Sequence, residues 1–383
     1  MTESVLIVGG GASGLAAAIT AANNGNRVVL LEKNERVGKK LLVTGNGRCN
    51  FGNLSVSDDS YNNNKFVSDV LLRAKEGANK LFEKIGLLSY ADPEGRLYPV
   101  SETATSVLDC LRFECERAGV EFVTGKTADA VYKRDVGYTV VCGNENLFAR
   151  KIIIAVGGKA QAPTYNLEKL VENRVIVPYA PSLTPIKVEP LPRALSGLRA
   201  KCVASLYKNG KPIRKEKGEV QFKDNSLSGI VILNMSSFIA RSKEENVFEI
   251  SLDLFPHIRF EELLPLLKER YSRFGSQHLM TGMFHNRLAD EIKRRAILLD
   301  KNDIFGLAAV IKDFRFTVTG LAGFSEAQVM CGGIDTKALK TSLEFRKNEG
   351  LYACGEVVDI DGLCGGFNLH WAFSSGIVAG ELE

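Results

Sequence analysis

Residues 4–34 read SVLIVGGGASGLAAAITAANNGNRVVLLEKN, and this stretch decides the fold. The apolar run at 5–8 predicts a short buried strand of a parallel sheet. An alanine-rich segment with helical character follows the glycines, and Gly25 is expected just after the end of that helix. RVVLLE, at 27–32, predicts a second buried strand. A strand, a glycine-rich turn, a helix and a second strand together predict a Rossmann-like α/β unit.

The glycines of this unit have the spacing of a dinucleotide site. Gly9 permits a tight turn, Gly11 lets the backbone approach a pyrophosphate, and Gly14 lets the helix and the strand pack closely. The start of the helix, near Ser13, offers unpaired N–H groups and a partial positive charge. Glu32 ends the second strand, where its carboxylate can accept hydrogen bonds from a ribose. The motif leaves FAD and NAD as alternatives, and Glu32 argues against a 2′-phosphorylated nucleotide.

The segment after the second strand favours FAD. Residues 33–53, KNERVGKKLLVTGNGRCNFGN, contain too many glycines and too few periodic apolar positions for an ordinary helix. An NAD domain usually proceeds to a regular βα unit here, whereas a glycine-rich basic loop can follow an extended ligand. Lys40 and Arg48 are available for anionic groups. A solvated basic loop is the alternative interpretation, and a redox role for Cys49 stays open.

The C-terminal end has a second glycine-rich helix entrance. LYACGE, at 351–356, predicts a strand, and Gly365-Gly366 precede the final helix. A reduced flavin carries negative charge near N1 and the C2 carbonyl, which the dipole and free N–H groups of a helix start stabilise. Glycines at the entrance let the ring approach, so the N–H groups of Phe367 and Asn368 would face it. We therefore expect both chain ends to meet around one flavin.

The middle of the chain predicts further strands and an inserted domain. Short strands are expected at 119–133, at 138–142 and at 152–156, and frequent prolines from 178 to 192 mark a crossing. Beyond it, residues 199–223 alternate as two strands about an Asn-Gly turn, and 260–312 read as helices. The predicted domains are 1–185, the first part of the FAD-binding domain; 186–318, an inserted substrate domain of strands and then helices; and 319–383, the C-terminal part of the FAD-binding domain.

Bulk composition excludes several classes of protein. Hydrophobic residues make up 45% and charged residues 25% of the 383, as in a globular protein. The net charge of +4 does not by itself indicate nucleic acid or an anionic membrane as a binding partner. The eight cysteines form no CxxC pair, and neither a secretory signal nor a membrane-spanning apolar run is present. We expect a cytoplasmic protein with no metal site, no membrane association and no nucleic-acid partner.

Several blocks of the chain together resemble one flavoprotein family. They are GGGASG…LLEKN…VGKKLLVTGNGRCN, GRLYPVSETATSVLDCL, GEVQFKDNSLSGIVILNMSS, VTGLAGFSEAQVMCGGID and GEVVDIDGLCGGFNLHWAFSSGIVAGE. In this order they resemble the aminoacetone-oxidase-like, or dehydro-bile-acid-reductase-like, FAD flavoproteins over nearly the whole chain. The resemblance implies a two-dinucleotide-binding FAD domain of glutathione-reductase-like type, interrupted by an inserted mixed β-barrel and helical domain.

The resemblance also implies FAD contacts from both ends of the chain, including a backbone contact from Ala128 to the adenine. Residues 159–170, KAQAPTYNLEKL, depart from the family, which usually has a longer stretch with Gly-Asp-Gly on the flavin and substrate side. His370 stands where a glutamine is more usual. With the first motif included, the expected FAD-binding residues are Gly9, Gly11, Ala12, Ser13, Gly14, Glu32, Lys33, Lys40, Thr44, Gly45, Arg48, Cys49, Asn50, Ala128, Ala155, Gly157, Gly355, Glu356, Gly366, Phe367 and Asn368.

These features predict an FAD-dependent oxidoreductase that transfers hydride between flavin N5 and a small organic substrate. No second GxGxxG occurs, so a dedicated NAD(P)H domain is not expected. Electrons would pass from or to diffusing NADH or NADPH, or to oxygen, which leaves a reductase and an oxidase open. The sequence identifies no catalytic side chain and no oligomeric state. The alternative function is a flavin-binding regulatory or RNA-associated protein without turnover.

Overall fold

The computed structural model describes residues 4–57, 59–74, 77–160, 166–242, 246–298 and 303–383. The chain divides into two compact units. Unit 1 consists of Met1–Ala180 and Val329–Glu383, so it contains both chain ends, and unit 2 is Pro181–Gln328. Each unit has its own cluster of buried apolar side chains, and we describe each unit by itself.

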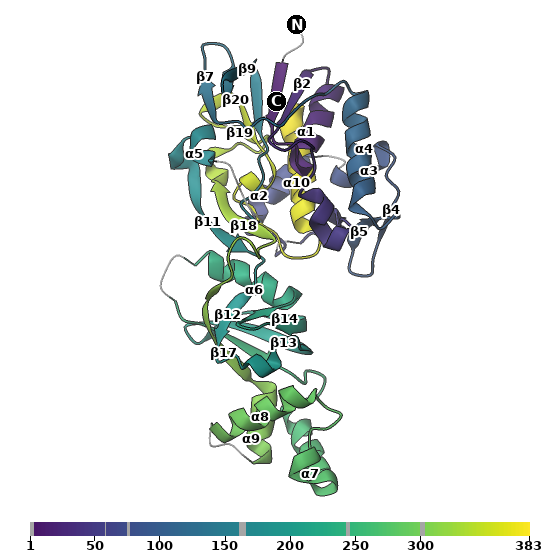
Figure 1. The fold of residues 1–383 in the computed structure, drawn as a ribbon, viewed down its shortest axis with the longest axis vertical. Coiled ribbons are helices and arrows are strands. Elements are labelled where there is room, and N and C mark those ends of the chain that lie inside the picture. Colours follow the sequence, from purple (N-terminus) through teal and green to yellow (C-terminus); the bar gives the residue numbers. More distant parts are fainter. Residues whose placement is uncertain (1–3, 58, 75–76, 161–165, 243–245, 299–302) are drawn as a thin grey trace. The chain divides into compact units, whose positions relative to one another are not determined.

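Unit 1 is built on a six-stranded sheet with the order β19-β20-β10-β1-β2-β6 (Figure 1). All strands from β20 to β6 run parallel, and only β19 is antiparallel to its neighbour. The apolar run at 5–8 forms β1 inside the sheet, where its side chains are at most 3% exposed. The strands are β1 Ser4–Val8, β2 Arg27–Glu32, β6 Glu121–Thr124, β10 Lys151–Ile154, β19 Glu344–Phe345 and β20 Asn348–Ala353.

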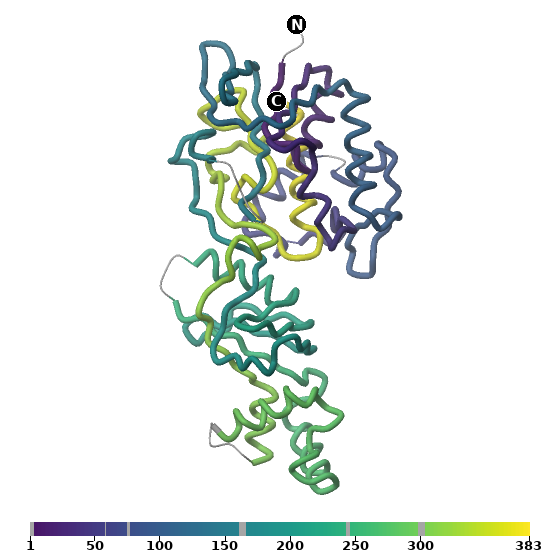
Figure 2. The backbone as a smooth tube through the Cα atoms, viewed as in Figure 1, coloured from purple at the N-terminus to yellow at the C-terminus, as the bar shows by residue number. Residues whose placement is uncertain are grey.

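The first and last helices of the chain pack against each other. Helix α1, Ala12–Asn23, follows β1, and helix α10, Phe367–Glu381, ends the chain. Glycines permit the contact, because a Cβ on Gly376 would lie 2.3 Å from the Ser13 carbonyl oxygen, and one on Gly380 would lie 2.6 Å from that of Ala17. Figures 1 and 2 show these purple and yellow segments side by side. The prediction that the two chain ends meet is confirmed.

Smaller elements surround this sheet. Helix α4 also packs against α1, and unit 1 further contains three small sheets, with the orders β3-β5-β4, β7-β8-β9 and β11-β18. Their bounds are β3 Gly52–Asn53, β4 Ser89–Ala91, β5 Arg96–Pro99, β7 Ala130–Lys133, β8 Tyr138–Cys142, β9 Glu145–Ala149, β11 Ile176–Ser182, β18 Val329–Ile334, α2 Asn64–Arg73, α3 Gly77–Lys84, α4 Ala104–Arg117, α5 Leu167–Leu170, and the 3-10 turns η1 Leu41–Gly47, η2 Asn173–Val175, η4 Thr336–Ala338 and η5 Gly355–Val357.

Unit 2 is a closed barrel with the strand order β12-β15-β14-β13-β16-β17, accompanied by helices. The predicted hairpin is confirmed, since Lys208 pairs with Lys211 across Asn209 and Gly210, which both have positive φ. The predicted helices between 260 and 312 are also present. The elements are β12 Ile186–Glu189, η3 Arg193–Leu195, β13 Arg199–Lys208, β14 Lys211–Phe222, β15 Ser226–Ser228, α6 Ile230–Ala240, β16 Phe248–Asp253, α7 Phe260–His278, α8 Asn286–Leu298, α9 Ile304–Lys312 and β17 Phe314–Leu321.

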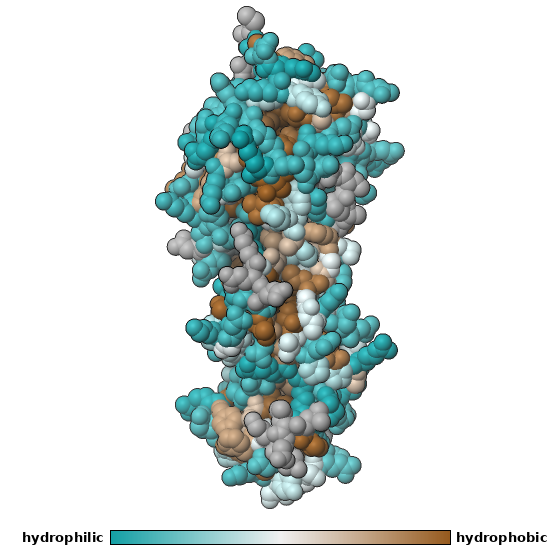
Figure 3. All heavy atoms as spheres, turned by 90° about the vertical axis from the view of Figure 1, so that its left-hand side faces the viewer, coloured by the Kyte–Doolittle hydropathy of each residue, from teal (hydrophilic) through white to brown (hydrophobic). Residues whose placement is uncertain are grey.

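The surface is mostly hydrophilic on the face that Figure 3 presents, with smaller apolar patches between the polar side chains. In unit 1, Leu42 and Val43 of the η1 turn are exposed although both are large and apolar. Over the part of the chain that the structure describes, no helix combines the length and the apolar character needed to cross a membrane.

The contact between α1 and α10 yields a first prediction, for Gly376→Ala. Alanine favours a helix over glycine by about 1 kcal/mol, so helix propensity alone would stabilise the variant. The new Cβ would meet the Ser13 carbonyl oxygen at 2.3 Å, however, and such overpacking costs about 1–3 kcal/mol. We expect urea denaturation to show a lower free energy of unfolding. A rise would mean that the two helices separate without cost.

Candidate functional site

The turn between β1 and α1 is shaped by three glycines with different surroundings. Gly9 has φ +112°, and a Cβ there would lie 2.4 Å from the carbonyl oxygen of Ala155. At Gly14 a Cβ would lie 1.9 Å from the carbonyl oxygen of Gly9, so only glycine fits. Gly11 instead faces open space, with nothing within 4 Å of its Cβ position. Two glycines therefore build the turn, and the third leaves room beside the start of α1.

The start of α1 presents backbone N–H groups to this open space. Gly11 is the N-cap residue and has no side chain with which to cap the helix. Ala12 and Ser13 follow as the first residues of α1, and the first N–H groups of an α-helix have no partner inside the helix. Together with the helix dipole, they form a site for a phosphate group. The structure thus places the residues of the first motif as a pyrophosphate cradle requires.

Glu32 closes this end of the site. Its Oε2 accepts a hydrogen bond from Gly10 N at 2.8 Å, and its Oε1 accepts one from Asn34 N at 2.9 Å. Asn34 Nδ2 also donates to Oε1, at 2.5 Å. The carboxylate has about four lone-pair positions, so these three bonds leave one position, on Oε2, for a ribose hydroxyl. Lys126 N donates to the Glu32 carbonyl oxygen at 3.2 Å, which brings the segment containing Ala128 beside Glu32. This is the place that the resemblance assigns to adenosine.

The start of α10 is a second helix entrance built on glycine. Gly366 is its N-cap with φ +95°, and a Cβ there would lie 2.3 Å from the Gly52 carbonyl oxygen. With its amide oriented to satisfy both neighbours, Asn50 accepts from Gly366 N at 3.1 Å and donates to the Gly52 carbonyl oxygen at 2.9 Å. Asn50 thereby fixes the entrance, and the next N–H group along the helix is that of Phe367.

Asn368 acts on the loop before the helix through its side chain. Its Oδ1 accepts from Gly362 N at 2.9 Å, and its Nδ2 donates to the carbonyl oxygen of the same glycine at 2.9 Å. Tyr61 supports the neighbouring residue, because its hydroxyl donates to the Phe367 carbonyl oxygen at 2.9 Å. Any contact from Asn368 to a ligand at this entrance would therefore come from its backbone N–H.

Residues from distant parts of the sequence contact one another around Glu356. Lys40 Nζ lies 2.7 Å from Glu356 Oε2, and Met330 N donates to Glu356 Oε1 at 3.1 Å. A Cβ on Gly158 would lie 2.3 Å from that same Oε1, so glycine at 158 makes room for the carboxylate. At the other side of the η5 turn, Gly355 has φ +78°, and a Cβ there would lie 2.3 Å from the Ser13 Oγ.

Other predicted residues lie in the same unit but have different partners. The Arg48 guanidinium forms an ion pair with Glu102 and stacks over the Tyr98 ring at 4.5 Å, so its charge is already matched. Thr44 donates through its hydroxyl to the Leu41 carbonyl oxygen at 2.7 Å within η1, where Gly45 has φ +56°. The remaining predicted residues are Lys33, which is exposed, and Gly157, which follows β10 with φ +74°.

Cys49 is a buried thiol held in an unusual backbone conformation. Its φ is +56°, and its N–H donates to the Thr44 carbonyl oxygen at 3.1 Å. Burial raises the pKa of the Cys49 thiol to about 12, with a smaller opposing effect of its hydrogen bond to Thr44. A neutral thiol is a poor nucleophile, so the redox role that the sequence left open for Cys49 has no support in this geometry.

His370 lies one turn into α10, and solvent does not reach Nδ1 of its ring. Its Nδ1 is buried and has no hydrogen-bond partner among the described residues, and a Cβ on Gly52 would lie 3.5 Å from it. Burial lowers the pKa of His370 below its ordinary value of 6.5, so the ring is neutral at pH 7. A neutral imidazole close to the α10 entrance adds no charge to the site.

Several residues of this site were not predicted from the sequence. Gly10 binds Glu32 through its backbone N–H, Asn53 Nδ2 donates to the Gly365 carbonyl oxygen at 2.8 Å, and Gly158 makes room for Glu356. Gly10 and Asn53 stand in segments already noticed for their glycines, and Gly158 follows the predicted Gly157, so their positions were a usable signal. Tyr61 stands in a segment without any motif, and Met330 lies in a block that resembles the family but was assigned no role there. Only the fold brings these two residues here. Of the divergent stretch 159–170, residues 161–165 lie outside the described residues.

The geometry fits FAD. Both helix starts are entered through glycine, and the two helices are in contact. Gly11 faces open space, whereas Gly366 is a glycine because a Cβ there would meet the Gly52 carbonyl oxygen. Residues at the β1–α1 turn suit the pyrophosphate, Glu32 suits a ribose, and the entrance of α10 suits the electron-rich edge of a reduced ring.

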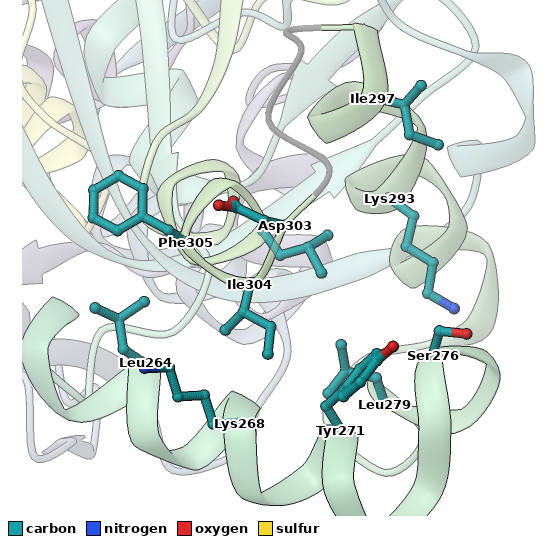
Figure 4. Close-up of a pocket in the computed structure, with 11 residues that line it drawn as sticks. Leu264, Lys268, Tyr271, Ser276, Leu279, Lys293, Ile297, Asp303, Ile304 and Phe305 are labelled. Atoms are coloured by element: carbon teal, nitrogen blue, oxygen red, sulfur yellow. The ribbon is translucent and has the colours of Figure 1, made fainter.

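A separate cavity of about 690 Å³ lies in unit 2, between α7, α8 and α9 (Figure 4). Apolar side chains from all three helices line it together with the polar ends of a few others. Every predicted FAD-binding residue belongs to unit 1, so this cavity is not part of the site described above. Examples of its lining residues are Leu264, Lys268, Tyr271, Lys293, Ile304 and Phe305.

The open space at Gly11 yields a second prediction. Gly11→Val should leave the fold intact, because the residue has φ −82° and ψ −168°, which valine adopts, and nothing lies within 4 Å of the Cβ position. The valine methyl groups would occupy the pyrophosphate position, so we expect at least a tenfold loss of bound flavin. Visible flavin absorbance measures the loss, and thermal unfolding of the flavin-free proteins is the control. Undiminished flavin binding in the variant would contradict the placement of the pyrophosphate.

Burial of His370 yields a third prediction, on pH. The unfolded chain takes up a proton near the ordinary pKa of 6.5, whereas the folded protein resists it until a lower pH. The unfolded state thus binds more protons in this interval, so stability is present above pH 6.5 and is lost as the pH falls toward the folded pKa. His370→Gln should flatten the profile of unfolding free energy between pH 7 and 5, and exposed His257→Gln should not. Equal profiles for both variants would contradict the prediction.

Comparison with known proteins places the chain among flavoenzymes. It is 30% identical, over 98% of its length and 97% of the other, to the 3-dehydro-bile acid delta(4,6)-reductase of Clostridium scindens. It is 28% identical, over 97% of its length and 95% of the other, to the ribosomal RNA dihydrouridine synthase of Escherichia coli.

A solved structure shares the architecture. The 3-ketosteroid delta1-dehydrogenase from Sterolibacterium denitrificans, in complex with 1,4-androstadiene-3,17-dione, superposes with a TM-score of 0.50 at 14% identity, over 99% of each chain. This likeness supports the Rossmann-type FAD-binding fold with an inserted domain that the sequence predicted. The HI0933-like protein Rossmann domain matches residues 3–382, and the chain therefore belongs to the HI0933-like family.

Proposed function

We propose that this protein is an FAD-dependent reductase of a carbon–carbon double bond conjugated to a carbonyl group. The observation that carries the proposal is the contact between α1 and α10, two helices from opposite ends of the chain that each begin directly after a glycine. When bound, FAD supplies hydride chemistry at its N5 atom. The protein supplies the position of the cofactor, the electrostatics around it and the exclusion of competing reactions.

Each chain end has a distinct task in holding the cofactor. The N–H groups of Ala12 and Ser13 at the start of α1 bind the pyrophosphate, and Glu32 binds a ribose. The N–H groups of Phe367 and Asn368 at the start of α10 stabilise negative charge on the reduced ring. These are predominantly backbone contacts, which explains why the site contains many glycines and few charged side chains.

The remaining predicted residues orient the loops around the cofactor. The ion pair between Lys40 and Glu356 holds the loop after β2 against the η5 turn, and Asn50 holds the entrance of α10. Contacts of this kind hold the cradle in shape and so reduce the ordering that cofactor binding must induce.

The reaction class is supported by what the two relatives have in common. A delta(4,6)-reductase of a 3-dehydro bile acid and a dihydrouridine synthase are both named for adding hydrogen across a carbon–carbon double bond. In a 3-oxo steroid and in uracil alike, such a bond is conjugated to a carbonyl. Conjugation makes the β-carbon, the alkene carbon remote from the carbonyl, electrophilic, so that this carbon accepts the hydride. A proton then adds to the α-carbon, which is bonded to the carbonyl.

The electron donor in this proposal is diffusing NADH or NADPH, since the sequence contains no second GxGxxG motif. A small conjugated ketone is the first candidate substrate. Uracil in RNA is the second candidate, because one relative is named for it and because basic residues concentrate in unit 2. This second candidate departs from the expectation, based on net charge alone, that the protein has no nucleic-acid partner.

The proposal predicts a specific order of spectral changes. Under nitrogen, NADH or NADPH should bleach the flavin of the purified protein, and a conjugated substrate should then restore its colour. Suitable substrates are a steroid 4-en-3-one and an unmodified uridine-containing RNA transcript, and the product should gain the mass of two hydrogens. A saturated steroid ketone is the matched control, since it has no double bond to reduce.

Two results would contradict the proposal. If nicotinamides leave the flavin coloured but an amine bleaches it, and oxygen then restores the colour, the protein is an oxidase. If no donor reduces bound FAD at all, the protein is a flavin-containing binding protein without turnover.

A further inference from the structure

The net charge of the chain is concentrated in one hairpin of unit 2. Residues 199–219, RAKCVASLYKNGKPIRKEKGE, contain seven lysines and arginines and two glutamates, so their formal charge is +5. The whole chain carries +4, and all other residues therefore sum to −1. The small net charge of the chain is therefore the sum of a strongly basic hairpin, formed by β13 and β14, and a nearly neutral remainder. We call this hairpin, residues 199–219, the basic ribbon.

Three lysines of the basic ribbon share its outer face. Lys201 stands opposite Glu219, Val203 opposite Lys217, and Ser205 opposite Lys215 in the antiparallel register. Side chains two residues apart in a strand point to the same face at a spacing of about 7 Å. Since Cys202, Ala204 and Leu206 are buried in the barrel, Lys201, Lys215 and Lys217 point outward, and all three are exposed. Lys208 and Lys211 flank the turn at the end of the same ribbon.

Acidic residues near this face are already engaged by other partners. Glu219 pairs with Arg199 at 3.3 Å. Glu216 pairs with Arg214 at 2.9 Å and also accepts from Asn234 Nδ2 at 2.8 Å.

Beside the ribbon, on β16, Glu249 pairs with Arg315 at 3.3 Å and Asp253 pairs with Lys312 at 2.6 Å. Within the described residues, none of the ion pairs involves Lys201, Lys215 or Lys217. Their charge therefore remains available to an external anion.

The ribbon also has an open backbone edge. β14 pairs with β13 along almost its whole length, but on its other side its described pairing is confined to Gln221 and Phe222, which meet β15. Lysines on such an edge can prevent two copies of a chain from joining their sheets. Protection against such pairing would require lysines only on β14, the strand with the open edge. Lys201 instead lies on β13, between β14 and β16 in the sheet.

We propose that the basic ribbon binds the phosphate backbone of an RNA strand. This inference rests on the RNA branch of the proposed function, and it assigns to unit 2 the task of holding the nucleic acid. Several lysines on one face, which form no ion pair with the described acidic residues, make the electrostatic footprint of a phosphate-binding surface. Binding to a membrane surface would also require large apolar side chains beside the lysines. Ile213 alone meets that description among residues 199–219.

Salt dependence of RNA binding tests the proposal. The variant is K201Q/K215Q/K217Q in the full-length protein with FAD bound, and the probe is a labelled single-stranded RNA of about twenty uridines. Each lost phosphate contact should reduce the slope of log K against log salt by about 0.7, so the slope should fall by about 2. That change corresponds to an affinity about a hundredfold lower at 0.1 M KCl. Fluorescence anisotropy measures both quantities.

A matched control has the same change of charge elsewhere. Lys65, Lys133 and Lys347 are exposed lysines of unit 1, and K65Q/K133Q/K347Q should retain the RNA affinity and the salt slope of the parent protein. Equal losses in both triple variants would show that only overall charge matters and would overturn the proposal. It would also be overturned if the ribbon variant formed larger assemblies while binding RNA normally, or if the parent bound phosphatidylserine vesicles but not RNA.

The flavin assay separates this inference from the proposed function. Reduction of a steroid 4-en-3-one by the ribbon variant should equal that of the parent, because no ribbon residue belongs to the cofactor site. If the parent binds RNA through the ribbon but reduces no double bond, the docking surface stands and the proposed reaction fails. If the parent reduces the steroid but its weak RNA binding is unaffected by the ribbon substitutions, the reaction stands and the docking surface fails.

Discussion

The close approach of α1 and α10 is the constraint on which the rest of the structure depends. Each helix brings glycine or small residues to the contact, and backbone oxygens of one helix lie where Cβ atoms of the other would otherwise be. Because α1 begins at the β1–α1 turn and α10 begins at Gly366, packing these helices together brings two helix N-termini into one unit. Residues separated by more than 300 positions thereby share one site.

In the proposed cofactor site, backbone N–H groups make most of the contacts to the ligand. A phosphate and a reduced flavin are both anionic, and a helix start offers N–H donors and a favourable dipole without any charged side chain. Side chains near the openings mainly hold the backbone in place, as Glu32 does for Gly10 and Asn50 does for Gly366. The Cys49 thiol and Nδ1 of His370 are both buried, and burial keeps both side chains uncharged at neutral pH.

The two units divide the chain's chemistry between them. Unit 1 contains all the residues of the proposed cofactor site, and its 26 lysines and arginines against 28 aspartates and glutamates give a formal charge of −2. Unit 2 contains the hairpin that accounts for the positive charge of the whole chain. A net charge of +4 spread evenly over the chain would carry no information about a partner, and from the net charge alone no nucleic-acid partner is expected. Register and burial change its meaning, because they place three of the lysines on one face and pair the nearby acids with other side chains.

The sequence by itself determined the βαβ start, the glycine-opened final helix, the inserted barrel hairpin and the identity of the cofactor class. These features follow from local patterns: apolar runs that must be buried, and glycines where a Cβ cannot fit. Only the tertiary structure decided which side chains meet, such as Lys40 with Glu356, Tyr61 with Phe367 and Arg48 with Glu102. Such pairs depend on how distant segments pack, and no spacing along the chain encodes that distance in space.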